Sequence, residues 1–395
     1  MHNLVMNPLL AIGHGLPNYQ AICAQDIQPA ISELLSKAEA AVAKSTASDT
    51  ANTWDDLVEP LEEATEALGR AWGVIGHLNS VKDSPELRDA YGAMLPEVTA
   101  FWSRLGQNLE LYKKYKALKE SASFSSLNTA QKKVIENALR DFRLGGAELS
   151  DTEKPRFSEI QERQATLAKE FSDHVLDATD QFVYATDKPE DVAGIPEDAL
   201  ASAAQLAQEK GLRGWAFSLH FPSYFPVQQY ANNRTLRQKM YEAYVTRASE
   251  LGPQYGQGQA EWNNQANVLE QLRLRDEEAK MLGYANYAAL SLAPKMAKTV
   301  QQVDQFLTDF AKRAQTFARQ DWSELTAFAK EHLQLSKLEP WDVAYASEKL
   351  KEAKYSFSEH EVKPYFPLPQ VLKGLFMVVQ TLFGVRIEKD ALPVW

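Results

Sequence analysis

Apolar residues recur at intervals of three and four over long stretches of this chain. The clearest run contains Leu57, Leu61, Leu68 and Ile75, which share one face of a helix because a helix has 3.6 residues per turn. Residues 151–181 show the same spacing between many charged residues. Strictly alternating patterns, which are typical of strands, are rare. The pattern therefore predicts a mainly α protein built from many amphipathic helices.

Capping residues mark the ends of the predicted helices. Ser84 can cap a helix that has Pro85 at its first position and Glu86 in its first turn. Thr299 and Gln302 form a possible capping box. The helices that we expect, in chain order, cover about 26–44, 53–75, 84–102, 129–144, 151–181, 196–210, 234–249, 261–282, 299–333 and 369–383.

Two segments, 181–185 and 215–221, are predicted strands because they are rich in β-branched or aromatic residues and are bounded by turns. We expect that they pair with each other, and that Pro222 and Pro226 lead from the second strand into a loop. Residues 385–388 are a possible third strand. These elements suggest three regions: a helical region at 1–180, a helix flanked by strands at 181–222, and a second helical region at 223–395.

Charge and cysteine content narrow the class of protein. The 395 residues include 42 basic and 53 acidic side chains, for a net charge of -11. This balance argues against nucleic acid as a partner, because binding phosphates needs clustered Lys and Arg. The chain has no polybasic patch and no run of about 18 apolar residues, so we expect no membrane contact. Cys23 is the single cysteine, which fits a reducing, cytoplasmic environment.

An aromatic-rich junction lies between residues 338 and 376. It contains seven Trp, Tyr and Phe side chains and the prolines Pro364, Pro367 and Pro369, through which a regular helix cannot run. Large aromatic side chains are usually buried. We therefore favour a corner of the core here over a surface that contacts a ligand, although both remain open.

Several motifs carry a resemblance to a known family. Residues 338–345 read LEPWDVAY and are followed by Glu348-Lys349, and residues 77–88 read HLNSVKDSPELR. Further matching segments are 127–133, 137–142, 175–179, 240–244 and 246–249. Together they resemble the thimet oligopeptidase family of zinc metallopeptidases, from about residue 7 to residue 395. His174 departs from the pattern, because the family has asparagine at this position.

The resemblance implies the N-terminal helical lobe of a two-lobed, neurolysin-like metallopeptidase. In that family two lobes face a deep, narrow channel, which admits short peptides to a zinc ion held by an H-E-x-x-H helix. The parent protein would be a cytoplasmic zinc endopeptidase that hydrolyses short peptides, including cleaved signal peptides. This chain contains no H-E-x-x-H and ends at Trp395. We therefore expect its catalytic zinc domain to lie outside the chain.

The histidines support the expectation that this chain holds no metal. A zinc helix needs two histidines four positions apart, and no two of the seven histidines have this spacing. The segment from His360 to Pro364 comes nearest, but proline has no donor atom for a metal. G-x-S-x-G and G-x-x-x-x-G-K-[ST] motifs are also missing from the sequence. We predict no catalytic residues, no metal ligands and no bound zinc in this chain.

Aromatic residues are the candidates for substrate contact, because aromatic faces with few polar groups suit apolar peptide side chains. They are Tyr224, Tyr241, Tyr244, Trp341 and Tyr345. Arg247 and Arg275 could meet a substrate carboxylate, although single arginines more often form surface ion pairs. Two functions remain open: the channel wall of a zinc oligopeptidase, whose partners are short peptides and the absent catalytic half, or a non-catalytic helical module that binds peptides.

Overall fold

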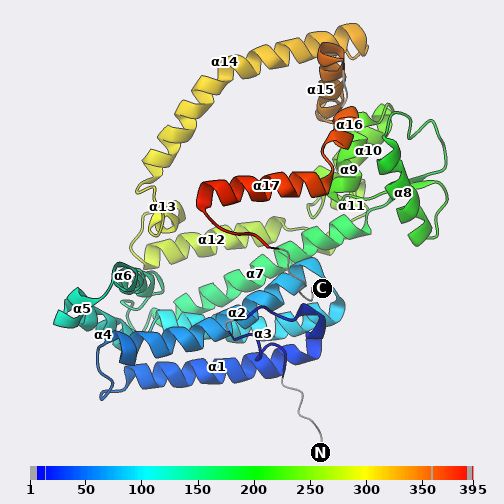
Figure 1. The fold of residues 1–395 in the computed structure, drawn as a ribbon. Coiled ribbons are helices and arrows are strands. Elements are labelled where there is room, and N and C mark those ends of the chain that lie inside the picture. Colours follow the sequence, from blue (N-terminus) through cyan, green and yellow to red (C-terminus); the bar gives the residue numbers. More distant parts are fainter. Residues whose placement is uncertain (1–6, 14, 357–358, 389–393, 395) are drawn as a thin grey trace, which may run out of the picture. The chain divides into compact units, whose positions relative to one another are not determined.

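The structure is a computed structural model that describes residues 7–13, 15–356, 359–388 and 394 (Figure 1). It confirms a mainly α fold, with one two-stranded sheet among the described residues. The described chain divides into two compact units. The first contains residues 7–168 and 271–300, and the second contains residues 169–270 and 301–388. The three regions predicted from sequence, with boundaries at 180 and 222, stay predictions.

Three long helices form the base of the first unit and lie side by side in Figure 1. They are α1 (Ala24–Thr46), α2 (Glu59–Val81) and α3 (Pro85–Gly106). Their apolar faces meet in one core, which includes Ile31, Leu68, Ile75 and Phe101. Burial of such side chains contributes roughly 1.5–3 kcal/mol each. The spacing of apolar residues therefore gave both the helices and the faces that they bury.

Local capping explains where these helices begin. Thr53 accepts a hydrogen bond from the Asp56 N–H at 3.2 Å, at the start of a π-helical turn (Trp54–Val58) that leads into α2. The Ser84 hydroxyl accepts from the Leu87 N–H at 3.2 Å, at the start of α3. Both caps satisfy backbone donors that have no partner within the helix.

The first unit also contains elements that the apolar pattern did not predict. These are α4 (Leu109–Glu120) and the short α5 (Ala122–Ser126), which precede α6 (Thr129–Leu144). Leu111, Tyr115 and Leu118 bury one face of α4 against the next core. With only three such residues among many lysines and glutamates, the spacing in α4 was too sparse to stand out.

The first unit also contains α13 (Tyr287–Leu292) and parts of two long helices, because the boundaries between the two units fall inside these helices. These helices are α7 (Lys154–Gln181) and α12 (Gln265–Met281). Within the first unit, Ile160 and Leu167 of α7 pack against Leu274 of α12. The regular apolar spacing of α7 does not mean burial at every such position, because the Phe171 side chain is exposed.

The sheet lies in the second unit and confirms the predicted pairing. Strands β1 (Tyr184–Thr186) and β2 (Trp215–Phe217) are antiparallel, with Tyr184 opposite Phe217. Helix α8 (Glu197–Glu209) packs against β2. Both strands are three residues long. Just before β2, Gly214 lies so close to Thr186 that a Cβ would be 2.2 Å from the Thr186 carbonyl oxygen, so only glycine fits there.

Two predictions for the second unit were wrong. Residues after β2 form helix α9 (Phe221–Tyr230) and not a loop. Pro222 is tolerated in the first turn, where backbone N–H groups lack partners in any helix, and Pro226 sits inside the helix. Residues 385–388 are not a strand: within the described residues they pair with no other strand, and a strand forms only when its backbone is paired.

The other helices of the second unit vary widely in length and burial. They are α10 (Arg234–Thr246), α11 (Gly252–Tyr255), α14 (Val300–His332, from residue 301), α15 (Pro340–Tyr355), α16 (Glu359–Val362) and α17 (Leu368–Phe383). Leu325 and Ala329 of α14 pack against Ala346 of α15. Elsewhere α14 exposes Phe306 and Phe310. Among the described helices none is long and apolar enough to cross a membrane.

Candidate functional site

Helices α9, α10 and α15 meet in the second unit around a buried ion pair. Arg237 of α10 donates from Nη2 to Asp342 of α15 at 2.9 Å, and from Nε to the Trp341 carbonyl oxygen at 3.1 Å. Arg234 donates to the same carboxylate at 2.7 Å. These bonds fix α15 against α10, because planar guanidinium groups hold a carboxylate in a defined orientation. The ion pair thus positions Trp341, which precedes Asp342.

Four of the five predicted site residues form two ring pairs on these helices. Tyr224 of α9 stacks on Tyr244 of α10, with ring centroids 4.1 Å apart and an interplanar angle of 11°. Tyr241 of α10 meets Trp341 of α15 edge to face, with centroids 6.0 Å apart. Such pairs each contribute roughly 0.5–1.5 kcal/mol beyond burial. The second pair brings together residues that are 100 positions apart in the sequence.

Tyr345, the fifth predicted residue, lies one turn further along α15. Its ring faces the Arg237 guanidinium, whose central carbon lies 4.1 Å from the ring centroid. Its hydroxyl donates to the Asn232 side-chain oxygen at 3.1 Å. These contacts give Tyr345 a role in holding the ion pair in place, in addition to any contact with a ligand.

Burial separates one of these aromatic residues from the others. Tyr224 is 7% exposed and belongs to the core. Tyr241, Tyr244, Trp341 and Tyr345 are half-buried, so part of each side chain remains accessible. Burial, and then the neighbouring Tyr244 and Tyr241, raise the pKa of Tyr224 to about 12. At neutral pH Tyr224 therefore carries no negative charge and keeps its hydroxyl proton.

The two arginines singled out from sequence lie in different surroundings. Arg247 caps the end of α10, and its guanidinium carbon lies 3.8 Å from the centroid of Tyr244. Arg275 belongs to the first unit and lies 5.2 Å from the Tyr287 ring centroid. Neither forms an ion pair within the described part of the chain. Surface ion pairs, the commoner role of single arginines, are therefore not seen for these two among the described residues, and contact with a substrate carboxylate stays a prediction.

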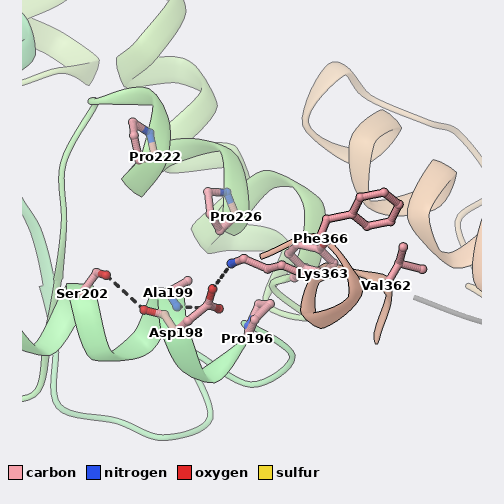
Figure 2. Close-up of a pocket in the computed structure, with 10 residues that line it drawn as sticks. Pro196, Asp198, Ala199, Ser202, Pro222, Pro226, Val362, Lys363 and Phe366 are labelled. Atoms are coloured by element: carbon pink, nitrogen blue, oxygen red, sulfur yellow. Dashed lines mark hydrogen bonds and ion pairs between the residues drawn. The ribbon is translucent and has the colours of Figure 1, made fainter. Parts of the chain in front are cut away.

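A pocket of about 570 Å³ in the second unit was missed by sequence reasoning. Figure 2 shows its wall, in which Pro222 and Pro226 of α9 face α8 and the segment after α16. Lys363 reaches across to form an ion pair with Asp198. In the sequence, only Pro222 and Pro226 single out this region, and they predict a loop and not the wall of a pocket.

Metal ligands do not gather in the part of the chain that the structure describes. No group of three or more His, Cys, Asp and Glu side chains there could hold a metal ion. His174 shares a hydrogen bond with Asn264 at 2.8 Å, and His220 pairs with Asp180 at 2.6 Å. Each of these two histidines has one polar side-chain partner, whereas a zinc site needs three protein ligands around one point. The described residues therefore do not fit the zinc ion that the resemblance implies.

Comparison with known proteins identifies the family. Residues 31–154 match the family model "Neurolysin/Thimet oligopeptidase, N-terminal domain", and residues 227–395 match "Peptidase family M3". The second match contains all of α10 and α15 and the last four residues of α9. The predicted resemblance is thus confirmed at both ends of the chain.

Curated relatives match almost the whole chain. Oligopeptidase A of Salmonella typhimurium is 43% identical over 390 residues, which is 98% of this chain and 57% of the relative. Oligopeptidase A of Escherichia coli is 42% identical with the same coverage. The "Probable cytosolic oligopeptidase A" of Arabidopsis thaliana is 37% identical over 99% of this chain and 56% of its own length. The chain thus spans a little over half the length of these relatives, and it belongs to peptidase family M3.

Proposed function

We propose that this chain is the substrate-restricting, channel-wall portion of a zinc metallo-oligopeptidase. The parent enzyme would hydrolyse short peptides, including cleaved signal peptides, in the cytoplasm. The names of the relatives support an oligopeptidase. A cytoplasmic location fits the single cysteine and one relative described as cytosolic, whereas another relative is described as organellar.

The aromatic cluster of α9, α10 and α15 is the observation that carries this proposal. It presents part of Tyr241, Tyr244 and Trp341 on a framework fixed by the buried Arg237–Asp342 pair. Rigid aromatic faces with a few hydroxyl groups bind apolar side chains of extended peptides without recognising one sequence. A wall of this kind suits an enzyme that accepts many short peptides.

Hydrolysis would require residues outside this chain. The described residues hold no group that could bind zinc, and the sequence contains no H-E-x-x-H. We therefore propose that the metal and the general base come from a further segment of the parent protein, and that this chain alone cleaves nothing. The exposed apolar side chains of α14 and α17, which include Phe306, Phe317 and Phe376, are candidates for contact with that segment.

Peptide binding and cleavage by the purified chain test this proposal. A fluorescence-quenched peptide should remain uncleaved, and metal analysis should find no stoichiometric zinc. An unlabelled apolar peptide of about ten residues should still bind and perturb tryptophan emission. Trp341→Leu should weaken binding about tenfold or more, since loss of a large aromatic contact costs over 1 kcal/mol. Trp322→Leu, on the exposed face of α14, is the matched control. Chelator-sensitive cleavage by this chain would refute the proposal.

The alternative is a non-catalytic helical module that binds peptides. The aromatic cluster fits such a binding module as well as it fits a peptidase channel wall. The lack of a metal-binding group among the described residues is also compatible with both functions. The reading frame after residue 395 separates the two functions. A continuation that encodes H-E-x-x-H supports the peptidase, and a stop codon directly after Trp395 supports the binding module. A separately produced catalytic segment should restore hydrolysis only in the first case.

A further inference from the structure

Arg247 forms the third layer of a stack that begins in the core of the second unit. Tyr224 lies against Tyr244, and Tyr244 lies against the Arg247 guanidinium, 3.8 Å from ring centroid to guanidinium carbon. A planar guanidinium stacks well on an aromatic face and is attracted by its electrons. The arginine also donates from Nη1 to the Tyr244 carbonyl oxygen at 2.6 Å. Its charged group is therefore held in one place.

The hydrogen-bonding capacity of Arg247 is largely unused. A guanidinium has five N–H donors, and within the described residues only the bond from Nη1 to Tyr244 is formed. Nε is buried without a partner. No carboxylate of the described chain lies within ion-pair distance of Arg247, although the protein carries a net charge of -11. Arg237, ten positions earlier, has both a carboxylate and backbone oxygens as acceptors.

We propose that Arg247 binds a carboxylate of the peptide that occupies the aromatic cluster. This inference rests on the proposed function and adds to it a preference for peptides that carry a carboxylate beside an apolar side chain. A fixed guanidinium beside apolar rings binds a carboxylate well, because little side-chain entropy is lost and nearby rings limit competition from water. The carboxylate could be the C-terminus of the peptide or an acidic side chain.

A purely structural role for Arg247 makes a different prediction. Arg247 is the C-cap residue of α10, and its bond to the Tyr244 carbonyl stabilises the end of that helix. If that were its whole role, replacing it would lower stability but would not alter discrimination between charged and neutral ligands. The choice between carboxylate and amide is therefore the informative measurement, and it can be made on the wild-type chain without any substitution.

Calorimetric titration with three matched peptides tests the proposal. One ends in a free carboxylate after an apolar residue, the second is its C-terminal amide, and the third is the amide with one internal glutamate. The wild-type chain should bind the free acid about tenfold more tightly than the plain amide, as expected for a hydrogen bond to a charged group. Equal affinity for acid and plain amide, with no gain from the internal glutamate, would overturn the role of Arg247. Failure of all three to bind would instead count against the proposed function.

Substitutions assign the preference to one side chain. Arg247→Gln should bring the affinities for acid and amide together, and Arg247→Lys should retain part of the preference because it keeps the charge. Arg213→Gln removes the same charge at an exposed site of the same unit and should leave the preference intact. If Arg247→Gln keeps the full preference, Arg247 is not the binding group. If the internal glutamate restores tight binding to the amide, the site recognises side-chain carboxylates as well as the C-terminus.

Discussion

Arg237 and Asp342 form an ion pair in which the two side chains are 2% and 0% exposed, with 2.9 Å between Nη2 and Oδ1. The pair joins α10 to α15 across more than 100 positions of sequence, and Arg234 adds a second, partly exposed guanidinium. A buried charge is tolerated only when it is paired and hydrogen-bonded. The pair therefore holds α10 and α15 in one relative position, and this fixes the positions of the aromatic residues on both helices.

Replacing Asp342 with asparagine should destabilise the second unit strongly. The change keeps the volume of the side chain but leaves the buried Arg237 guanidinium without a counter-charge. Breaking a buried pair in this way costs about 3–5 kcal/mol. Urea denaturation of Asp342→Asn, followed by tryptophan fluorescence, should show this loss in the free energy of unfolding. Asp309→Asn disrupts an exposed pair with Arg313 and should cost less than about 1 kcal/mol. Equal effects of the two substitutions would contradict this account.

The same pair should make stability depend on pH in the acid range. Burial alone would raise the pKa of Asp342, but hydrogen bonds from Arg234, from the Glu339 N–H and from Arg237 outweigh it, and the pKa lies below its ordinary value of 3.8. A carboxyl group with a lowered pKa in the folded state stabilises the fold above its unfolded pKa. This stabilisation is lost as the pH falls from 3.8 through the lower folded pKa.

Denaturation curves at several pH values should show this loss. As the pH falls through 3.8 and below, the free energy of unfolding of the wild-type chain should fall more steeply than that of Asp342→Asn, so the two curves should converge at low pH. Other carboxyl groups titrate in both proteins and cancel in the comparison. Curves that remain parallel over this range would show that Asp342 does not titrate as described.

Sequence reasoning recovered most of the helices for a physical reason. Spacings of three and four, together with caps such as Thr53 and Ser84, depend only on local residues, and the structure follows them. The pairing of β1 with β2 was also accessible, since these were the two credible strands in the central region. Helices α4, α9 and α15 were not predicted, and neither were the shorter α5, α11, α13 and α16. The apolar residues of α4 are few. In α9, Pro222 fits the first turn, whereas Pro226 lies inside the helix, around which α8, α10 and α15 pack.

The exposure of the residues in the candidate site could not be predicted from the local sequence. The sequence suggested Tyr224, Tyr241, Tyr244 and Trp341 as a group, and the structure brings them together. It could not show that Tyr224 is buried while the other three are half-exposed, because this depends on contacts between helices distant in sequence. Nor could it predict that Arg247 has no counter-ion among the residues that the structure describes. The absence of a nearby carboxylate is a property of the packed helices and has no local signature.

A close contact between two glycine backbones in the first unit should be intolerant of a methyl group. Gly145, after α6, faces Gly106 at the end of α3, and a Cβ at Gly145 would lie 2.8 Å from the Gly106 Cα. No flexible side chain can move aside, so Gly145→Ala should separate the two backbones and cost about 1–3 kcal/mol, as overpacking does. Thermal unfolding followed by circular dichroism measures the effect.

Gly73→Ala is the control, because it should change the free energy of unfolding in the opposite direction to Gly145→Ala. Gly73 lies inside α2, and a Cβ there would meet nothing within 4 Å. Alanine should therefore stabilise the helix by about 0.5–1 kcal/mol, because glycine loses more backbone entropy on folding. If Gly145→Ala also stabilised the protein, the close approach of α3 and α6 would be wrong.

Tyr224 should make stability depend on pH in the alkaline range. Its pKa is raised from the ordinary 10.0 to about 12, first by burial and then by Tyr244 and Tyr241. A tyrosine with a raised pKa in the folded state contributes stability that is fully present below pH 10, and this stability is lost as the pH rises from 10 toward 12. Tyr224→Phe keeps the ring that stacks on Tyr244 and removes the ionising group. The variant should therefore lose less stability than the wild-type chain between pH 9 and pH 11.5 in urea denaturation.

Tyr255→Phe, at an exposed position, should follow the wild-type curve. If Tyr224→Phe and the wild-type chain lose stability in parallel, the hydroxyl of Tyr224 is not enclosed by the cluster. Tyr224, which stacks on Tyr244 beneath Arg247, is then more open to solvent than its exposed fraction of 7% indicates.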